Sequence, residues 1–579
     1  MRPLSLALVL SLVGASLAQE LLIRDGHGHG HGHHAQPLLE LNETEITLYH
    51  DPTPPSYYTI DWDVLDPKRH PGLIITHALL MFFAFFVCLP MGLALRSAKH
   101  PLRGVAVGAF YGTFLLACSA SSLYRKTTPD MYPHQRHSRH GYLLLFASLA
   151  LTAIDTFAAS VRIFQYVRAG RPYSFRGLWS SAVGREMEDE AANAEYAGLI
   201  SEEPESMEEA GHEMKRGRTS YDHGTTAQWA NHVRHHSTHS DGTLFMPSSP
   251  HSEATLHDAH LPFVPRVSLV RRIGRALFAI TERLIIVTAF GISLSGIVVY
   301  TGGCRQNYIN GCLAHLIKGG IFWCYGIASF ARYLGWGAGI GWAWNLPPQS
   351  GKPTAEFFES AVIFIYGITN VWMERFGAQA GDPFTTKQLQ HIGIAIMFWG
   401  AGLVGMAVES KVVRRWLAGL AVNSSETVSE PKTYTASFNP FPALVIGVTG
   451  SVMAAHFQTY LFQVQIHSLW GNLLLAFAVM RCITYFFVWV SPPKSTLPSR
   501  PPTEALASFF LTAGGISFMF STEELTIAAM RRGRDDIMLF VVAAVAFTCI
   551  AFCWTIGVVG FHAWVKQRSK PAVSYRDTA

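Results

Sequence analysis

Charged residues are scarce in this chain, and their scarcity bounds its class. Only 15% of its 579 residues are Asp, Glu, Lys or Arg, whereas 49% are hydrophobic. Soluble globular domains carry about a quarter charged residues, so the composition excludes a soluble multidomain protein. The formal net charge of +5 is small for this length, and we expect no nucleic-acid partner. The sequence predicts a protein whose first partner is the lipid bilayer.

Several catalytic motifs are missing too. The chain has no GxxxxGK[ST] loop, no GxGxxG turn and no GxSxG elbow, which argues against ATP-driven pumping and serine-hydrolase chemistry. Its eight cysteines lack the CxxC spacing of zinc sites. Cys304 and Cys312 flank a polar turn; we expect a disulfide there if the turn is extracytoplasmic, the alternative being two free thiols. The residues leave open whether the protein is an enzyme.

What the sequence does contain is long apolar runs. About eleven of them reach the roughly 20 residues that a helix needs to cross a membrane. They predict an all-α polytopic integral membrane protein with about eleven transmembrane helices in two modules. The predicted spans cover residues 73–95, 103–123, 140–164, 284–301, 313–334, 355–373, 387–408, 441–463, 467–491, 503–520 and 537–563. Residues 335–344 are too short to cross alone, so we expect a loop or a re-entrant piece there.

The N-terminal region combines a targeting pattern with a histidine run. Residues 1–18 contain Arg2, an apolar stretch and small residues before a cleavage point, the pattern of a secretory signal peptide. We expect residues 19–72 to be a luminal or extracellular segment, glycosylated at the Asn-Glu-Thr sequon of Asn42. Imidazoles on a Gly-rich backbone can wrap zinc or copper; the alternative is a solvated low-complexity tail. The histidines concerned are His27, His29, His31, His33 and His34.

A polar interruption divides the chain. Residues 165–275 pass from an acidic block to Ser-, Thr- and His-rich sequence, which predicts a disordered cytosolic linker. The linker separates a three-helix module, 73–164, from a multi-helix domain, 276–565, that ends in a cytosolic tail, 566–579. The basic loops and the signal peptide place the N-terminus in the lumen or outside and the C-terminus in the cytosol. We expect the protein to enter the secretory pathway and reside in the plasma membrane or an endomembrane.

The first half carries a specific motif. His77-Ala78-Leu79-Leu80-Met81 leads to Leu89-Pro90-Met91-Gly92-Leu93 and Arg96, and His140-Gly141 opens the third predicted span. This pattern resembles the cytochrome b-561 superfamily, in which paired histidines on facing helices hold haem b. The resemblance implies one b-type haem on His77 and His140. The second and fourth predicted spans lack an internal histidine, so we expect no second haem. The alternative is a pair of interfacial histidines without a cofactor.

The whole arrangement resembles the fungal YTP family, named for a "yeast putative transporter". The motifs that carry this resemblance are Ala314 to Gly320, Glu359 to Glu374, His456, and His467 to Gly471. The family's name implies transport or electron transfer by likeness, without naming a substrate.

The second half places ionisable residues at or just inside the ends of apolar runs, where such residues are a functional hypothesis. We expect five of them in one luminal leaflet, where they could ligate zinc, copper or iron or relay protons. They are His315, Glu374, His391, His456 and His467. Lys318 adds a positive charge, which favours an anion or proton role over a dication. Glu523 and Glu524 are expected on the same side, and Glu356 and Glu359 on the cytosolic side.

These observations favour transmembrane electron transfer through one b-type haem, with a redox partner still undefined. A metal-ion or proton-coupled transporter is the first alternative. A non-catalytic membrane organiser, whose linker recruits partners, is the second. An intramembrane metallohydrolase is the most remote reading, because three histidines could hold a zinc-bound water.

Overall fold

The described part of the chain is helical. The computed structural model describes residues 36–58, 69–98, 100, 102–170, 174, 177–178, 181, 269–344, 346, 353–373, 384, 386–420, 437–456, 458–492 and 500–568. Every regular element within these ranges is a helix, apart from one isolated β-bridge between Leu38 and Tyr460, so the all-helical prediction is confirmed. The predicted signal peptide, the histidines at 27–34, Glu374 and most of the linker lie outside the described residues.

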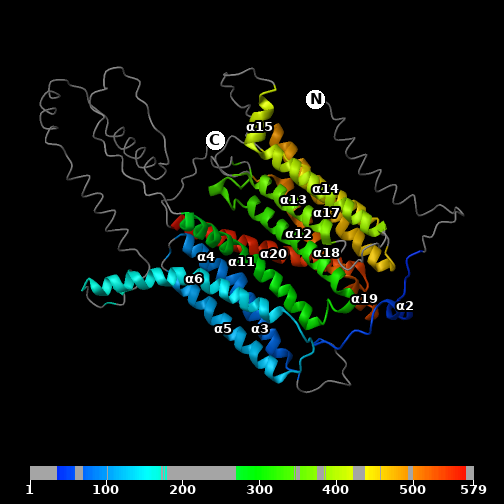
Figure 1. The fold of residues 1–579 in the computed structure, drawn as a ribbon, viewed down its shortest axis with the longest axis horizontal. Helices are drawn as coiled ribbons and strands as arrows, with labels where there is room; N and C mark the ends of the chain where they lie inside the picture. The colour runs from blue at the N-terminus through cyan, green and yellow to red at the C-terminus, as the bar shows by residue number, and fades with distance from the viewer. Residues whose placement is uncertain are drawn as a thin grey trace. The chain divides into compact units, whose positions relative to one another are not determined.

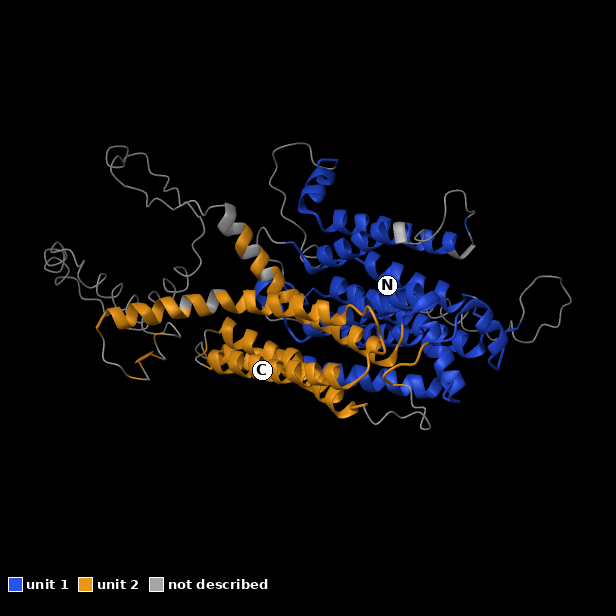
Figure 2. Cartoon of the chain, turned by 60° about the horizontal axis from the view of Figure 1, so that its bottom comes forward, with its two compact units in different colours: residues 1–53, 304–555 blue, residues 54–303, 556–579 orange. Residues whose placement is uncertain are grey.

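The chain forms two compact units, which Figure 2 shows in different colours. Unit 1 comprises residues 1–53 and 304–555, and unit 2 comprises residues 54–303 and 556–579. The helix Leu269–Thr301, labelled α11, therefore groups with the N-terminal module. The sequence, in contrast, predicts that the C-terminal domain begins at residue 276, which assigns the predicted span at 284–301 to that domain.

Unit 1 contains the larger set of helices (Figure 1). They are α2 (Glu43–Tyr49), η5 (Gln306–Tyr308), α12 (Ile309–Tyr333), η6 (Ala338–Ile340), α13 (Ala355–Met373), α14 (Thr386–Glu409), α15 (Lys411–Ala418), α16 (Phe441–Ala454), α17 (Leu461–Val490), α18 (Pro502–Phe520), α19 (Glu523–Arg531) and most of α20 (Ile537–Arg568). The 3₁₀ turn η6 lies in the segment expected as a loop, between glycines with positive φ at 337 and 341.

Unit 2 is a smaller bundle. Its helices are α3 (Pro71–Phe83), the π-helical turn η3 (Ala84–Cys88), α4 (Leu89–Ser97), α5 (Arg103–Thr127), α6 (His137–Arg168), α11 and the end of α20. Phe85 of η3 packs edge-on against Phe110 and Phe114 of α5 to form its core. On the α4 side, Arg96 forms an ion pair with Glu282 of α11 at 3.2 Å.

Eight helical segments are long and apolar enough to span a membrane within the described ranges. They are Pro71–Ser97, Arg103–Thr127, Ile280–Thr301, Gln306–Tyr333, Gln388–Glu409, Leu461–Val490, Pro502–Phe520 and Ile537–Arg568. The remaining predicted spans correspond to α6, α13 and α16, which are helical but are not among these eight. The prediction of an integral membrane protein is confirmed, whereas the count of eleven spans is not. At 14 residues α16 is roughly 21 Å long, short of a hydrocarbon core of about 30 Å.

Glycines let the helices of unit 1 approach closely. A Cβ on Gly319 of α12 would lie 2.7 Å from the Gly515 carbonyl oxygen of α18, and a Cβ on Gly367 of α13 would lie 2.7 Å from the Ala395 carbonyl oxygen of α14. Small residues at such crossings are the usual means of packing membrane helices, because lipid supplies no hydrophobic force between them. The core formed between these pairs includes Trp470, which is fully buried.

The boundary between α16 and α17 differs from the prediction. The predicted spans ended at residue 463 and resumed at residue 467, whereas α16 ends at Ala454 and α17 begins at Leu461. A capping box explains the early start, since the Gln463 side chain accepts from the Tyr460 backbone N–H at 3.4 Å. His456 therefore lies in the turn after α16, and His467 lies well inside α17 instead of opening it.

Candidate functional site

In unit 2, two histidines from different helices lie close together. The rings of His77 (α3) and His137 (α6) lie with centres 6.5 Å apart and planes nearly perpendicular, at 89°. His77 Nδ1 is 2.9 Å from the Ala117 carbonyl oxygen of α5. Because a carbonyl only accepts, this nitrogen carries the proton, and the lone pair is on Nε2.

The second ring is fixed in the same way. His137 Nδ1 lies 2.8 Å from Ser295 Oγ of α11, and that hydroxyl donates to the Ile292 carbonyl at 2.8 Å. The hydroxyl proton is therefore engaged, and His137 Nδ1 donates to the serine oxygen. Both imidazoles thus keep the Nε2 lone pair, the form that binds a metal.

The structure differs from the expected haem pair in one member. His137, and not His140, lies against His77. His140 comes one turn later and lines a groove of about 580 Å³ between α6 and α11. The predicted span began too late, because Gln135 Oε1 accepts from the Ser138 backbone N–H at 3.1 Å and helps start α6 at residue 137. The sequence signal that could have identified His137 was its position one helical turn before His140.

In unit 1, the predicted luminal cluster forms two pairs. The rings of His315 (α12) and His467 (α17) are centred 6.0 Å apart, and those of His391 (α14) and His456 are centred 6.3 Å apart. The fifth predicted ligand, Glu374, lies outside the described residues. Among the residues that the structure describes, no three His, Cys, Asp or Glu side chains gather closely enough to hold a metal ion.

A small cavity with a few polar groups in a mostly apolar wall lies beside these pairs. It measures about 50 Å³ and is lined from five helices, α12, α13, α14, α16 and α18. Its polar lining includes Lys318, Asn370, His391 and Thr449. Asn370 Oδ1 is buried and has no hydrogen-bond partner within the described ranges. A cavity of this size has room for a few water molecules, which the polar groups in its wall could bind.

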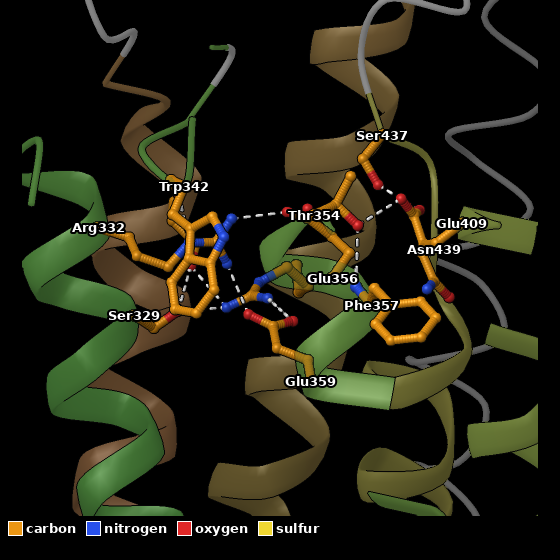
Figure 3. Close-up of polar contacts among 12 residues, drawn as sticks. Ser329, Arg332, Trp342, Thr354, Glu356, Phe357, Glu359, Glu409, Ser437 and Asn439 are labelled. Carbon is orange, nitrogen blue, oxygen red and sulfur yellow. Dashed lines mark hydrogen bonds and ion pairs between the residues drawn. The ribbon is translucent and has the colours of Figure 1, made fainter. Parts of the chain in front are cut away.

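Farther along the same helices lies a buried ion-pair cluster, which we call the arginine–glutamate cluster. Figure 3 shows Arg332 of α12 directed at Glu356 and Glu359 of α13. Its two terminal nitrogens each lie 2.6 Å from one of these carboxylates, and its Nε donates to the Trp342 carbonyl at 2.7 Å. By helix rise, Arg332 is roughly 25 Å from His315 along α12.

The cluster continues into α17 and α18. Arg481 lies 2.7 Å from Glu504 Oε1 and 3.3 Å from Glu359 Oε2. Ser329 donates to the same Glu504 oxygen at 2.8 Å and also contacts Arg481. Arg481 is 1% exposed and Glu504 is fully buried. The five charged members are Arg332, Glu356, Glu359, Arg481 and Glu504.

Hydroxyl groups surround a further carboxylate nearby. Glu409, at the end of α14, accepts from Thr354 at 2.8 Å and from Ser437. Figure 3 shows Asn439 beside Glu409. Asn439 donates to Ser360 at 3.0 Å. This carboxylate is therefore held by neutral donors.

Sequence reasoning missed most of this cluster. The sequence predicts Glu356 and Glu359 on the cytosolic side but gives no partner for them; in the structure their side chains are 8% and 11% exposed and paired with arginine. Arg332, Arg481 and Glu504 lie inside predicted apolar spans, and charges at those positions were the available signal.

The segment before α2 and α2 itself cross the histidine-bearing end of unit 1. Leu38 exchanges backbone hydrogen bonds with Thr459 and Leu461, each 2.9 Å long. Glu43 binds Arg531 through both carboxylate oxygens, at 2.8 and 2.7 Å. Asn42, the predicted glycosylation site, is exposed and caps α2. We call residues 36–50 the N-terminal strap.

The strap contacts the turn that the cysteines flank. The structure joins Cys304 and Cys312 by a disulfide, and Glu524 accepts from the Cys304 backbone N–H at 2.7 Å. His50 stacks on Tyr308 and lies 3.3 Å from Glu523. Burial raises the pKa of the Glu524 carboxyl above its ordinary value, against the lowering effect of the Cys304 backbone N–H. The two predicted acidic residues therefore hold this turn and the strap together.

The fold and its buried charges define an all-helical integral membrane protein with two helical units. Comparison with known proteins narrows the class. A family model described as "Protein YTP1-like, C-terminal" matches residues 288–563, and one described as "Domain of unknown function (DUF2427)" matches residues 58–159.

Curated relatives agree with these matches. "Uncharacterized membrane protein C3B8.06" of Schizosaccharomyces pombe is 32% identical over 499 residues, covering 82% of this chain and 91% of the relative. "Uncharacterized membrane protein YCR061W" of Saccharomyces cerevisiae is 35% identical over 280 residues, covering 45% and 44%. "Protein YTP1" of the same yeast is 23% identical over 273 residues, covering 47% and 51%. The chain belongs to the YTP1-like family of membrane proteins. No solved structure matches it.

Proposed function

We propose that unit 2 binds one b-type haem between His77 and His137 and takes part in transmembrane electron transfer. The close approach of these two rings, which come from different helices, is the observation that carries the proposal. Two imidazoles that ligate one metal from opposite sides hold their ring centres about 6 Å apart, since each metal–nitrogen bond is about 2 Å long. The 6.5 Å separation of these rings supports that arrangement.

The number of ligands also favours haem over a free ion. In the described part of the chain no third His, Cys, Asp or Glu joins this pair. A free zinc or iron ion held by two imidazoles would be under-coordinated, whereas a haem would need only these two ligands from the protein. A Cβ on Gly296 would lie 3.1 Å from His137 Cε1, so this glycine leaves room for the ring.

Haem would supply a one-electron redox couple within the bilayer. The protein's own contribution is to orient the two rings and hold their protons on Nδ1, through the Ala117 carbonyl and Ser295 hydroxyl oxygens. Such outer contacts raise ligand basicity and tune reduction potential. The electron would pass to a redox partner or to a metal ion at the membrane surface.

A visible spectrum tests the proposal. The purified full-length protein should give a reduced-minus-oxidised spectrum of b type with about one haem per chain. His77→Ala and His137→Ala should each lose it, whereas His140→Ala, the matched control one turn away, should retain it. Native protein purified with added haem that shows no such spectrum would refute the proposal. Loss in His140→Ala with retention in His137→Ala would assign the haem to the other histidine.

A second candidate function is transport of a metal ion or proton through unit 1. The specific observation in its favour is the cavity lined from five helices, with Lys318, His391 and Asn370 in its wall. Sites inside helix bundles, lined by a few convergent polar groups, suit solute binding. Uptake of a metal ion or of protons by vesicles that contain the purified protein tests this function. Lys318→Met should lower the uptake, whereas Lys411→Gln, on the exposed helix α15, is the control and should not. Equal uptake by Lys318→Met and native protein would count against this function.

A further inference from the structure

The arginine–glutamate cluster carries more carboxylates than guanidinium groups. It contains Arg332 and Arg481 against Glu356, Glu359 and Glu504, which leaves one negative charge in excess. None of the five side chains is more than 11% exposed. An uncompensated charge at such depth is strongly disfavoured, and a buried carboxylate usually escapes that penalty by binding a proton. The excess therefore points to one carboxyl of the cluster as a proton-binding group.

Hydrogen bonding singles out Glu504. Its Oε1 accepts from Arg481 and Ser329, but its Oε2 is buried and has no hydrogen-bond partner among the described residues. Glu359, in contrast, has each oxygen engaged by a different arginine, Arg332 on Oε1 and Arg481 on Oε2. Two guanidinium groups hold Glu359 in its charged form. Glu504 pairs with only one guanidinium group, that of Arg481, which also pairs with Glu359.

We propose that Glu504 Oε2 is a site for one exchangeable proton and that Arg481 changes partner with its occupancy. When Glu504 is ionised, Arg481 is held by both carboxylates, at 2.7 Å from Glu504 and 3.3 Å from Glu359. When a hydronium ion supplies a proton, its O–H bond breaks to leave water, an O–H bond forms on Oε2, no electron moves, and the charge that held Arg481 is gone. Arg481 then pairs with Glu359 alone.

This exchange changes which helices Arg481 joins. In the ionised state Arg481 ties α17 to both α18 and α13, and in the protonated state it ties α17 to α13 alone. The charged groups that act on Glu504 itself are Arg481 of α17, Arg332 of α12 and Glu359 of α13. The other titratable groups of the cluster are Tyr325 of α12, Glu356 of α13 and Tyr485 of α17. Glu504 lies in the first turn of α18, so a proton from water at that end has only about one helical turn, roughly 5 Å, to cross. The inference is independent of the haem proposal and deepens the transport candidate, because it names the group that would couple proton movement to a change in the bundle.

Infrared difference spectroscopy on the purified full-length protein tests the site directly. Spectra between acidic and alkaline pH should contain the C=O stretching band of a neutral buried carboxylic acid. The band should be present in Glu409→Gln, which removes another buried carboxylate, and it should be lost when Glu504→Gln is added to that variant. Glu504→Asp should shift it. Counting protons taken up after a pH jump should give about one fewer per chain in the double variant than in Glu409→Gln alone.

The outcomes separate the proton site from the transport function. A band that persists in the folded double variant would overturn the proposal. If that variant does not fold, the spectra of Glu504→Asp and of the native protein still test the proton site. A native protein without any titrating carboxylic acid band would exclude it. If the double variant loses the band but vesicles with the native protein take up neither metal ions nor protons, the proton site is supported and the transport function is contradicted. Proton-driven uptake that is normal in Glu504→Gln would contradict the coupling role.

Discussion

Arg481 and Glu504 lie 2.7 Å apart with both side chains shut off from solvent. Removing one member of a buried pair strands the other charge, which typically costs about 3–5 kcal/mol. We therefore expect Arg481→Met to lower the stability of the protein in detergent by about that amount, seen as a large fall in Tm. The double variant Arg481→Met, Glu504→Leu should recover much of the loss, because no unpaired charge is added. Arg415→Met, at an exposed position, is the control and should change Tm little.

The glycine crossings of unit 1 make a second prediction. A Cβ on Gly367 would lie 2.7 Å from the Ala395 carbonyl oxygen and 2.8 Å from Trp399 Cα, both on α14, and neither backbone atom can move aside cheaply. Gly367→Ala should destabilise the protein by about 1–3 kcal/mol, the usual range for overpacking. Gly400→Ala on α14 is the matched control, since nothing lies within 4 Å of its added methyl group. It should be neutral or slightly stabilising, and equal losses in the two variants would show that packing is not the cause.

The helical class of this fold could be predicted from composition because long apolar runs have few other structures available. The boundaries of individual helices were harder to predict from the sequence. The apolar residues Tyr460, Leu461 and Phe462 extend the run that precedes them, so hydropathy alone gives no break there. The break depends on the capping contact between Tyr460 and Gln463 and on backbone pairing with Leu38. Leu38 is distant in sequence, and no local pattern reveals it.

The sites show the same limit. His77 could be singled out from its motif, but its partner depended on where α6 begins, which Gln135 helps set locally. Arg332 and Arg481 were visible as charges inside apolar runs, yet that they share Glu359 follows only from the packing of α12, α13 and α17. Sequence reveals which residues are unusual for their surroundings. The fold decides which of them meet.

The N-terminal strap provides a pH prediction. Hydrogen bonding and charge from Arg531 hold the pKa of Glu43 below its usual value. A carboxyl with a lowered pKa in the folded protein contributes stability above its ordinary pKa, and this is lost as pH falls through the lowered value. The contribution is small because both side chains are largely exposed. Hydrogen exchange at the His50 amide, which donates to the Ile46 carbonyl, should accelerate relative to other strap amides under acid. Glu43→Gln should show fast exchange already at neutral pH, and a variant as protected as the native protein would contradict the role of this pair.

The Ser295 hydroxyl gives the last test, because it accepts from His137 Nδ1 at 2.8 Å without contacting the Nε2 side of the ring. Removing such an outer contact typically weakens metal affinity about 10–100-fold. We expect Ser295→Ala to bind haem more weakly and to show a shifted reduction potential, while its reduced spectrum remains of b type. Ser293→Ala is the matched control on the same helix, since that hydroxyl donates to the Ala289 carbonyl one turn away. Redox titration with haem-retention measurements compares the two variants. If both variants behave like the native protein, the Ser295 hydroxyl does not position His137. If Ser295→Ala alone shifts the reduction potential, the serine acts through the His137 ring, because a merely structural role would not produce that shift.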